Sequence, residues 1–451
     1  MLSPSIILKS QLEGAKRLDA EYYQPEYLNV DNLINRFKKF KISEIADVVY
    51  GTTPEGANFV DSGVPFIRSQ NFDMSIINED DLVHCSKKFH GKNKKSSIAS
   101  GDILFAAVGA TIGELAIVQN SIEDGNINQN IAKIRINNRE VSPYFVWIFF
   151  NSKMGQYQIE RLITGNAQPY LNSEQIKEFI IPKIKRQDLF QKYFKDICFE
   201  AEKSKLLYHQ AEKLLLEELD LENFGGQNDS LFTIINLSEA KKVVRLDPEY
   251  FNSDVNKLLD KIKKISKPVG DLVSIKKGIE PGAEEYKETG KQFIRVSSLS
   301  KYGINDSDQK CLSEELYQKL KDDFQPKKGE ILLTKDASPG ITYVLKEDID
   351  GIVSGGILRL KIKDKSVEDE YLALCLNSIV GQIQAERDAG GSVIKHWKPE
   401  QIKQAMIPIL PKPAQEKISS LIRESFVARE KAKELLDEAK RKVEEMIEKE
   451  E

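Results

Sequence analysis

The sequence contains few of the features that mark a secreted, membrane-bound or disulfide-stabilised protein. Its four cysteines are widely separated among 451 residues and form no Cys-x-x-Cys pair, which argues against a disulfide framework or a zinc finger and fits a reducing compartment. The opening residues MLSPSIILKS are too short and too polar for a signal peptide, and no apolar run approaches about 18 residues. We therefore expect a cytoplasmic protein that does not associate with a membrane.

Recognisable catalytic motifs are also missing. Gly91-Lys92 and Gly290-Lys291 are not followed by Ser or Thr, so no P-loop is present, and neither GxSxG nor HExxH occurs. The Asn/Asp-Pro-Pro-aromatic motif of amino-methyltransferases is absent as well. His84, Cys85 and His90 are close in sequence, but they lack a second cluster, so we expect them at the surface rather than around a metal. We predict no catalytic residue, metal or cofactor in this chain.

Neither sign of charge is in large excess, since the 66 Lys and Arg residues nearly balance the 70 Asp and Glu residues and leave a net charge of −4. A nucleic-acid-binding protein is usually basic, so this balance at first argues against DNA. The acidity is concentrated, however, because residues 187–222 carry a net charge of −4 and residues 413–451 one of −2. The remainder is mildly basic, and the overall charge does not exclude DNA binding.

The chain is a tandem duplication with an offset of 226 to 228 residues. Residues 17–22, with the sequence RLDAEY, return at 245–250 as RLDPEY. NSKMGQYQIER at 151–161 matches NSIVGQIQAER at 377–387 at seven of eleven positions. Further matches lie in the same order along both halves, and such collinearity does not arise by chance. A length of 451 residues accordingly accommodates two globular copies.

Each copy begins with a globular part, predicted at residues 1–186 and 241–412, in which short apolar runs alternate with turn residues and helical stretches. In the first copy the runs that predict strands are 103–108, 115–118 and 131–136. Residues 144–163 and 371–387 predict one helix in each copy. The composition and pattern therefore indicate an α/β or α+β domain of ordinary size in each half.

A long polar helix is expected after each globular part, over residues 187–223 and 413–451, with a linker at 224–240. Apolar or small residues recur there in steps of three and four, which is the 3.5-residue period of a coiled coil. The seam positions are Phe190, Phe194, Ile197, Ala201, Ser204, Tyr208, Ala211 and Leu215, and Ile418, Ile422, Ser425, Ala432, Leu436, Ala439, Val443 and Met446. Two matching seams most simply pair with each other, although each helix could instead pack on its own domain.

These features together resemble the DNA-specificity (S) subunit of a type I restriction–modification system. The resemblance rests on the duplicated layout, the RLDxEY opening of each half, and a Gly-x-x-Pro turn at 51–54 and 278–281 before a Phe-Ile-Arg strand. Gly-Asp/Glu-Ile-Leu and a Gln-Ile-Lys…Ile-Pro segment follow in both halves, ahead of the long helix. The resemblance covers essentially the whole chain, and the order of the motifs, occurring twice, is specific.

The resemblance implies an α/β (α+β) fold with two tandem target-recognition domains and an antiparallel coiled coil. It implies a non-catalytic subunit that binds a bipartite site in double-stranded DNA and directs two methyltransferase subunits, and restriction–translocase subunits, to that site. S-adenosylmethionine, ATP and Mg would be bound by those partners. Two other interpretations are a specificity subunit serving a fused restriction–methyltransferase enzyme and a two-lobed coiled-coil scaffold that does not bind DNA.

The long helices have a length that suits a spacer. A helix of about 36 residues is roughly 54 Å long, which corresponds to on the order of 16 base pairs of B-DNA. Two reading domains joined by such a helix would recognise two short sites with an unread gap. An acidic spacer would not hold the phosphates itself and could contact partner subunits.

Residues that read DNA are expected where the two copies differ, because the copies would read different half-sites. The divergent segments are 69–99 against 296–327 and 164–171 against 390–397. Polar and basic side chains there suit base edges or phosphates. The candidates in the first copy are Arg68, Ser69, Gln70, Asn71, Lys92, Asn93, Lys94, Lys95, Gln129, Asn166 and Gln168. Those in the second copy are Arg295, Ser297, Ser298, Lys335, Ser338, Lys395 and His396.

Some of these positions carry a more specific expectation. The lysine-rich segment 92–95 suits phosphate contacts. Arg68 and Arg295 occupy equivalent positions, which favours a shared structural or phosphate role over sequence reading. Tyr170 and Trp397 flank the divergent loops and are expected to belong to the core.

Overall fold

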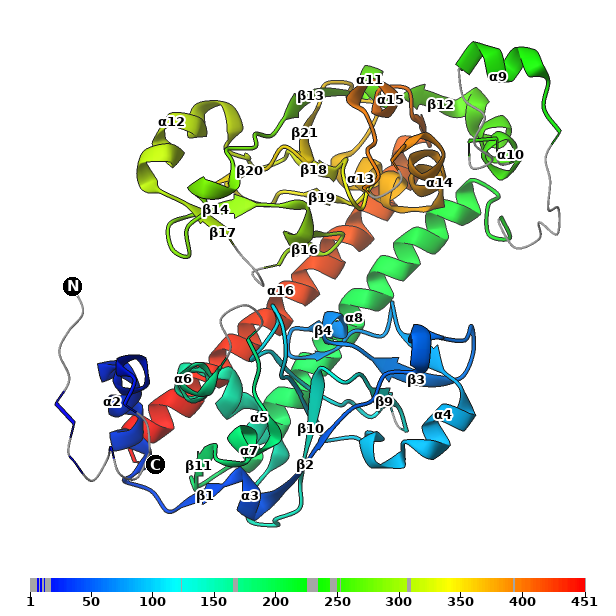
Figure 1. The fold of residues 1–451 in the computed structure, drawn as a ribbon. Helices are drawn as coiled ribbons and strands as arrows, with labels where there is room; N and C mark the ends of the chain where they lie inside the picture. The colour runs from blue at the N-terminus through cyan, green and yellow to red at the C-terminus, as the bar shows by residue number, and fades with distance from the viewer. Residues whose placement is uncertain are drawn as a thin grey trace. The chain divides into compact units, whose positions relative to one another are not determined.

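The computed structural model describes residues 6–7, 9, 12, 18–122, 124–164, 169–224, 234–243, 250–251, 253–305, 310–391 and 394–450. The chain divides into unit 1, Met1–Glu202 with Ala428–Glu451, and unit 2, Lys203–Val427. Figure 1 shows the elements of both units. Arg17 and residues 245–249 of the repeated RLDxEY motif lie outside the described residues.

Unit 1 is built around a six-stranded sheet of order β2-β10-β7-β8-β5-β4, with a three-stranded sheet β6-β3-β9 and the pair β1-β11. The strands are β1 Lys39–Lys41, β2 Ala46–Tyr50, β3 Val64–Ile67, β4 Phe72–Asp73, β5 Ile76–Ile77, β6 Val83–Cys85, β7 Ile103–Ala106, β8 Leu115–Ile117, β9 Asn126–Ile127, β10 Ile131–Ile136 and β11 Ile180–Pro182. The three apolar runs that predicted strands correspond to β7, β8 and β10. β7 is buried at all four positions, as its unbroken apolar sequence requires.

Unit 2 repeats this plan, with the sheets β13-β21-β18-β19 and β17-β14-β20 and the pairs β12-β22 and β15-β16. The strands are β12 Ser266–Pro268, β13 Val273–Lys277, β14 Lys291–Ile294, β15 Leu299–Ser300, β16 Gly303–Ile304, β17 Lys310–Leu312, β18 Ile331–Thr334, β19 Thr342–Val344, β20 Gly351–Val353, β21 Ile357–Ile362 and β22 Met406–Pro408. In both units the three-stranded sheet is mixed, because β3 pairs parallel with β9, and β14 with β20. The predicted duplication is therefore also a duplication of topology.

Helices cover these sheets in both units and mix with the strands as the predicted fold class requires. In unit 1 they are α2 Pro25–Ile34, α3 Ile42–Ile45, α4 Lys87–Lys92, α5 Pro143–Asn151, α6 Lys153–Leu162 and α7 Ser173–Lys177. In unit 2 they are α9 Leu237–Val243, α10 Ser253–Ile262, α11 Val269–Leu272, α12 Glu314–Phe324, α13 Asp369–Asn377, α14 Ile379–Asp388 and α15 Pro399–Ile402. Two long helices, α8 Asp188–Glu218 and α16 Lys412–Glu448, each cross the boundary between the units.

The single helix predicted over 144–163 is in fact two helices, α5 and α6, and the one over 371–387 is α13 and α14. The breaks fall at Ser152 and Ser378, which have extended backbone angles. The Ser152 hydroxyl accepts a hydrogen bond from the N–H of Gly155, and that of Ser378 from the N–H of Val380. A buried serine that caps a new helix therefore interrupts a periodicity that looks continuous in the sequence.

The identities between the two copies serve this architecture. Gln158 donates to the carbonyl of Ile180 and accepts from its N–H, at 3.0 and 2.9 Å. Gln384 makes the same two contacts with Met406, at 3.0 and 2.8 Å. In both copies the glutamine thus fastens the helix pair to a short edge strand, so its recurrence reflects folding rather than DNA reading.

Gly155 and Gly381 occupy equivalent positions at the start of α6 and α14 and permit close helix contact. A Cβ on Gly155 would lie 2.2 Å from the carbonyl oxygen of Phe149, and one on Gly381 would lie 2.3 Å from that of Leu376. Because both neighbours are backbone atoms, they cannot move aside as a side chain would.

We expect Gly155→Ala and Gly381→Ala each to lower the free energy of unfolding by about 2 kcal/mol. Chemical denaturation followed by circular dichroism measures this. Gly91→Ala in α4 is the control, since a Cβ there meets nothing within 4 Å and should be neutral or slightly stabilising. Equal effects at all three positions would contradict the steric argument.

The two long helices pair, as their matching seams predicted, and they run antiparallel, as the resemblance implied. In unit 1, Phe190, Phe194 and Ile197 of α8 share one core with Leu436 and Val443 of α16. In unit 2, the later residues of α8, from Tyr208 to Leu215, share a core with the early α16 residues Ile418 and Ile422. All the predicted seam positions are buried. The helices lie side by side in Figure 1 as the green and red-orange rods.

Candidate nucleic-acid interface

Five loops meet at one edge of the sheets in unit 1, and backbone hydrogen bonds hold them together. We call this set loop cluster 1 and define it as residues 51–54, 67–71, 107–113, 127–130 and 169–171. The N–H groups of Thr52, Asn128, Ala107 and Gly109 donate to the carbonyls of Ile127, Ile67, Asn130 and Pro169, at 3.1, 3.1, 2.8 and 3.1 Å. Segments distant in sequence are thereby fixed as neighbours.

Unit 2 contains the equivalent loop cluster 2, defined as residues 278–281, 294–298, 335–340, 353–356 and 394–397. The N–H groups of Ile279, Ser354, Lys335 and Ala337 donate to the carbonyls of Val353, Ile294, Gly356 and Lys395, at 2.9, 2.9, 2.9 and 3.0 Å. These four contacts repeat those of loop cluster 1. The two clusters therefore share a backbone scaffold that carries different side chains.

The glycine of the Gly-x-x-Pro turn makes the hydrogen bonds from Thr52 to Ile127 and from Ile279 to Val353 sterically possible. A Cβ on Gly51 would lie 2.1 Å from the carbonyl oxygen of Ile127, and one on Gly278 would lie 2.1 Å from that of Ser354. Only a residue without a side chain allows the turn to approach the β9–β10 and β20–β21 loops this closely.

Most of the predicted DNA-reading residues lie in the loop clusters. Loop cluster 1 contains Arg68, Ser69, Gln70, Asn71 and Gln129, with Gln70 and Gln129 exposed. Loop cluster 2 contains Arg295, Ser297, Ser298, Lys335, Ser338, Lys395 and His396. Asn166 and Gln168 lie outside the described residues. Lys92, Asn93, Lys94 and Lys95 belong to a separate basic segment of unit 1, since β3 and β6 are antiparallel and α4 leaves the end of β6 away from Arg68.

Two of these candidates make internal hydrogen bonds. The Asn71 Oδ1 atom accepts from the N–H of Arg68 at 2.9 Å, and Asn71 is buried. Ser298 is buried too, and its Oγ accepts from the N–H of Arg295 at 3.0 Å. A base contact from either side chain would cost these bonds. The Arg68 guanidinium also donates to the carbonyl of Asp81 at 3.1 Å, which is a structural contact of the kind expected for this position.

Loop cluster 2 brings two of its predicted residues, Lys335 and His396, into one ionic group with Asp336. Asp336 bonds to the Lys335 ammonium, and its Oδ1 atom lies 2.7 Å from Nδ1 of His396. The neighbouring Ser338 and Lys395 side chains are exposed. Asp336 lies between two predicted residues, Lys335 and Ser338, in the sequence, but an acidic residue does not by itself indicate DNA binding. Its position between Lys335 and His396 is apparent only after folding.

Sequence reasoning was wrong about Tyr170 and correct about Trp397. Trp397 is fully buried, as expected of a core residue, whereas Tyr170 is 45% exposed. Residues 169–171 and 395–397 each run across a neighbouring loop, and successive side chains there point to opposite sides. Tyr170 and Trp397 occupy successive positions in these equivalent segments, so one is exposed and the other is buried. An exposed aromatic residue in loop cluster 1 is thus an additional candidate for contact with a nucleic acid.

The prediction that His84, Cys85 and His90 form a surface group was also wrong for two of the three. Cys85 and His90 are buried, and the His90 Nδ1 atom lies 2.5 Å from Oδ1 of the buried Asn126. The Asn126 amide in turn donates to the carbonyl of Asn93 at 3.1 Å. These residues support the basic segment from beneath. The described residues contain no group of three potential ligands that could hold a metal.

Glu114 is a half-buried carboxyl at the end of the loop formed by residues 107–113. Burial raises the pKa of Glu114 from its ordinary value to about 7. Since the charged form is disfavoured in the folded state, the stability that this shift contributes is present below about pH 4.5 and is lost as the pH rises through about 7. Glu114 had no sequence signal, because a single glutamate in a turn looks solvated.

We therefore expect Glu114→Gln to raise the free energy of unfolding relative to the unmodified protein at pH 8, by about 2 kcal/mol after allowance for partial exposure. At pH 5 the two proteins should be nearly equal in stability. Urea denaturation at several pH values measures the difference. A difference that does not change between pH 5 and 8 would show that the carboxyl is not perturbed.

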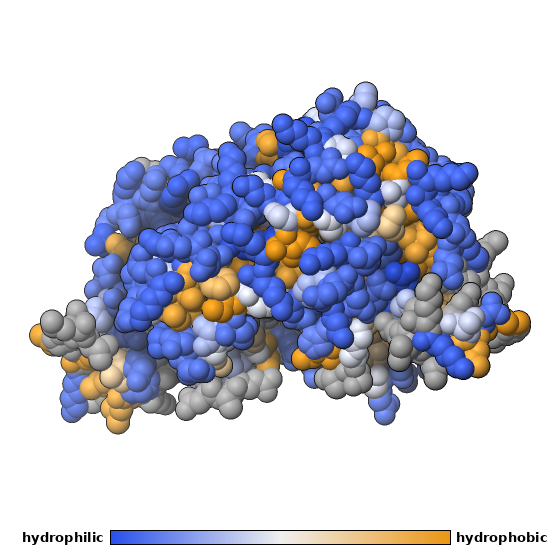
Figure 2. Space-filling model, turned by 90° about the horizontal axis from the view of Figure 1, so that it is seen from above, coloured by the Kyte–Doolittle hydropathy of each residue, from blue (hydrophilic) through white to orange (hydrophobic). Residues whose placement is uncertain are grey.

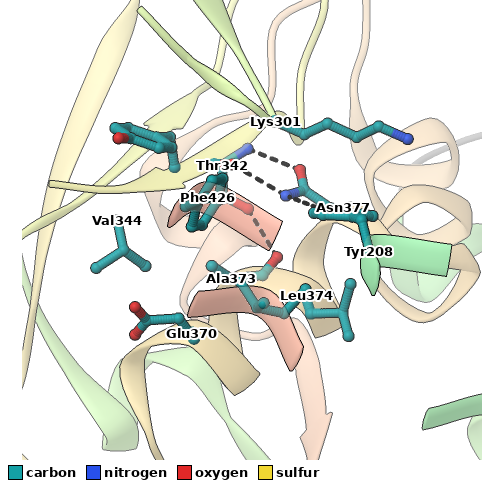
Figure 3. A pocket seen from close by; sticks show the side chains of 11 residues that line it. Tyr208, Lys301, Thr342, Val344, Glu370, Ala373, Leu374, Asn377 and Phe426 are labelled. Atoms are coloured by element: carbon teal, nitrogen blue, oxygen red, sulfur yellow. Dashed lines mark hydrogen bonds between the residues drawn. The ribbon is translucent and has the colours of Figure 1, made fainter. Parts of the chain in front are cut away.

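The hollow in unit 2 that Figure 3 shows is not a ligand site. It lies where the sheet and α13 meet the helix pair, and Tyr208, Lys301 and Phe426 are among the residues that line it. Asn377 closes it by donating to the Tyr208 hydroxyl at 3.2 Å and to the carbonyl of Thr342 at 2.9 Å. Its volume of about 10 Å³ accommodates one water molecule at most.

A comparison with protein families decides what kind of protein carries these duplicated loop clusters. The family model described as "Type I restriction modification DNA specificity domain" matches the chain twice, at residues 35–199 and 259–434. The chain belongs to this family. The two matches cover most of the chain and coincide with the two copies of the repeat. The protein is therefore a DNA-sequence specificity subunit, a class of protein that is not itself an enzyme and needs no cofactor of its own.

Solved structures of similar layout exist, although their likeness is distant. The S subunit of a type I restriction–modification system from M. genitalium is 14% identical, with 91% of this chain and 95% of that chain covered and a TM-score of 0.36. The HsdS subunit from Thermoanaerobacter tengcongensis is 13% identical, with 91% and 96% covered and a TM-score of 0.27. No curated protein matches the chain. The assignment of this specificity subunit rests on the family match and not on these structures.

The surface of the specificity subunit is mostly hydrophilic on the face drawn in Figure 2, with small separate groups of hydrophobic residues. In the described part of the chain no helix combines the length and the apolar character needed to cross a lipid bilayer. Exposed hydrophobic side chains on the long helices include Phe199 in unit 1 and Leu206 and Val427 in unit 2.

Proposed function

We propose that this specificity subunit reads a bipartite site in double-stranded DNA, one half-site with each loop cluster. The observation that carries the proposal is the pair of loop clusters, which have the same backbone hydrogen bonds and different side chains. A shared scaffold with exchanged side chains is what two readers of different short sequences require. The exposed side chains of Gln70 and Gln129 in unit 1, and of Ser297, Ser338, Lys395 and His396 in unit 2, are the proposed base-reading residues.

The proposed roles of the remaining candidates follow from their surroundings. Arg68 and Arg295 stabilise the loops that follow β3 and β14, and Ser69 lies next to Arg68 in the first of these loops. Lys92, Lys94 and Lys95, with Asn93 between them, hold DNA phosphates. Phosphate contacts set the register and supply most of the salt-dependent affinity, while base contacts select the sequence.

The specificity subunit is further proposed to direct two methyltransferase subunits, and restriction–translocase subunits, to its site in the cytoplasm. The exposed Phe199, Leu206 and Val427 on the helices support a protein partner, since large apolar side chains outside a core favour an interface. S-adenosylmethionine, ATP and Mg would be bound by those partners. We also propose that the chain consists of five parts. They are two target-recognition domains at residues 1–186 and 241–412, two spacer helices at 187–223 and 413–451, and a linker at 224–240.

Co-expression with the genes adjacent to its own, followed by pull-down and mapping of methylated adenines in the host DNA, tests the proposal. A methyltransferase in the complex and a two-part methylated motif are the expected results. A fused restriction–methyltransferase partner would indicate the related alternative system. If no methyltransferase is bound and no bipartite motif appears, the proposal fails, and a coiled-coil scaffold without DNA binding becomes the better interpretation.

A further inference from the structure

Within each loop cluster two loops cross, and the crossing has the same backbone contacts in both units but apolar side chains in unit 1 and polar side chains in unit 2. We call it junction 1 in unit 1, residues 107–109 with 169–171, and junction 2 in unit 2, residues 335–337 with 395–397. In junction 1, Val108 forms an antiparallel bridge with Tyr170, and the N–H of Leu171 donates to the carbonyl of Ala107 at 2.9 Å. In junction 2, the same positions are the bridge Asp336–His396 and the bond from Trp397 to Lys335 at 2.7 Å.

The match extends to the backbone conformation and to the returning strand of each junction. Gly109 and Ala337 both have a positive φ, of 91° and 60°. Ala337 tolerates this conformation only with strain, so its agreement with the glycine shows how closely the two backbones correspond. On the other side, Tyr170 also bridges Thr164, and His396 also bridges Gly390.

The side chains on this common backbone differ in kind. Junction 1 carries Ala107, Val108, Pro169 and Tyr170, which are apolar apart from the tyrosine hydroxyl. Junction 2 carries Lys335, Asp336, Lys395 and His396 at the same four positions, all of them polar or charged. These four positions have therefore changed their chemistry between the copies, while the backbone contacts of the junction have been kept.

The central side chain of each junction is available to a ligand. Tyr170 is 45% exposed, and the side chain of His396 is 56% exposed. Asp336 holds Nδ1 of His396 at 2.7 Å, and Nε2 makes no hydrogen bond within the described residues. This nitrogen can pair with a donor or an acceptor on a base edge, depending on the protonation of the ring.

We propose that the two junctions determine which base pair each unit reads, with Tyr170 and Val108 contacting a thymine methyl group and His396 and Asp336 reading a base edge by hydrogen bonding. The thymine methyl is the one apolar feature of the major groove, and an exposed apolar surface suits it. A histidine oriented by a carboxylate suits the donor and acceptor pattern of an edge. This inference rests on the proposed function, since it presumes that each unit reads a half-site.

The first test uses the unmodified protein in complex with its methyltransferase subunits and needs no variant. Once the methylated motif is mapped, each thymine in a duplex carrying it is replaced in turn by deoxyuridine, which removes only the methyl group. We expect one such replacement, in one half-site, to weaken binding about fourfold, which is the loss associated with one buried methyl group. If no thymine is sensitive in either half-site, the proposal is overturned.

The second test assigns that thymine to junction 1. The double variant Val108→Asp/Tyr170→His should lose the sensitivity to deoxyuridine and change the motif in that half-site only. The reciprocal Asp336→Val/His396→Tyr should change only the other half-site. The unaltered unit in each variant is the internal control for folding, and Tyr170→Phe should keep the original motif.

Each remaining outcome has a definite meaning. A double variant that keeps the original half-site, or changes both half-sites, overturns the inference while leaving the bipartite proposal intact. If the double variant is inactive altogether, the deoxyuridine scan on the unmodified complex decides alone. Failure to find any two-part motif would instead overturn the proposed function itself.

Discussion

Replacing Lys94 and Lys95, two of the proposed phosphate contacts, together with the neighbouring Lys87 and Lys88 of α4 with glutamine is expected to weaken DNA binding. It should also make the salt dependence shallower by up to about four in the slope of log affinity against log salt. Each lysine that neutralises a phosphate releases about one counterion, so the loss should be largest at low salt. All four side chains are exposed in unit 1. Titration of DNA into the complex at several salt concentrations measures the slope.

The duplication supplies a matched control for this prediction. Ser86 caps α4 by accepting from the N–H of Phe89 at 3.1 Å, and Ser313 caps α12 in the same way with Leu316 at 3.2 Å. At the far end, Lys133 donates to the carbonyl of Lys95 at 2.9 Å. Arg359 donates to that of Asp323 at 2.6 Å. The two segments are thus held at both ends by equivalent contacts, although α12 is a longer helix than α4.

Their charges are reversed. The positions of Lys87, Lys88, Lys94 and Lys95 are taken in unit 2 by Glu314, Glu315, Asp322 and Asp323. We therefore expect neutralisation of those four acids, to glutamine or asparagine, to leave the salt slope unchanged or to strengthen binding slightly. A fall in affinity in both variants, or in neither, would mean that the lysine segment does not hold phosphate.

Deleting one heptad from each long helix is expected to shorten the unread gap in the DNA target by about three base pairs. Seven helical residues correspond to about 10 Å, and one base pair to about 3.4 Å. Residues 198–204 of α8 and 425–431 of α16 are suitable for deletion, because the two partners of each contact between these segments are deleted together. Ser425 donates to the Ser204 carbonyl at 2.7 Å within unit 2, and Lys431 bonds to Glu200 within unit 1.

After this double deletion the helices keep the phase of their seams, since Ala211 takes the place of Ser204 and Ala432 that of Ser425. Mapping methylated adenines in cells that express the variant gives the new gap. Deletion from α8 alone is the control, and it should abolish the complex because the seams no longer match. An unchanged gap in the double variant would show that the helices do not set the spacing.

The sequence by itself determined the features that depend on local pattern and on self-comparison. The offset of 226 to 228 residues predicted two copies of one topology, and the steps of three and four predicted two helices whose seam positions are buried in cores that both helices share. These inferences succeed because periodicity records which face of an element is buried. The order of the repeated motifs likewise indicated the family.

Only the tertiary structure decided which residues meet. Each loop cluster assembles from five segments spread over residues 51–171 or 278–397 through backbone hydrogen bonds, which leave no trace in side-chain pattern. Tyr170 is exposed and Trp397 buried, although both flank equivalent loops, because the crossing of the chains sets the direction of each side chain. Asp336 and Glu114 acquire their significance in the same way, the first from His396 beside it and the second from burial.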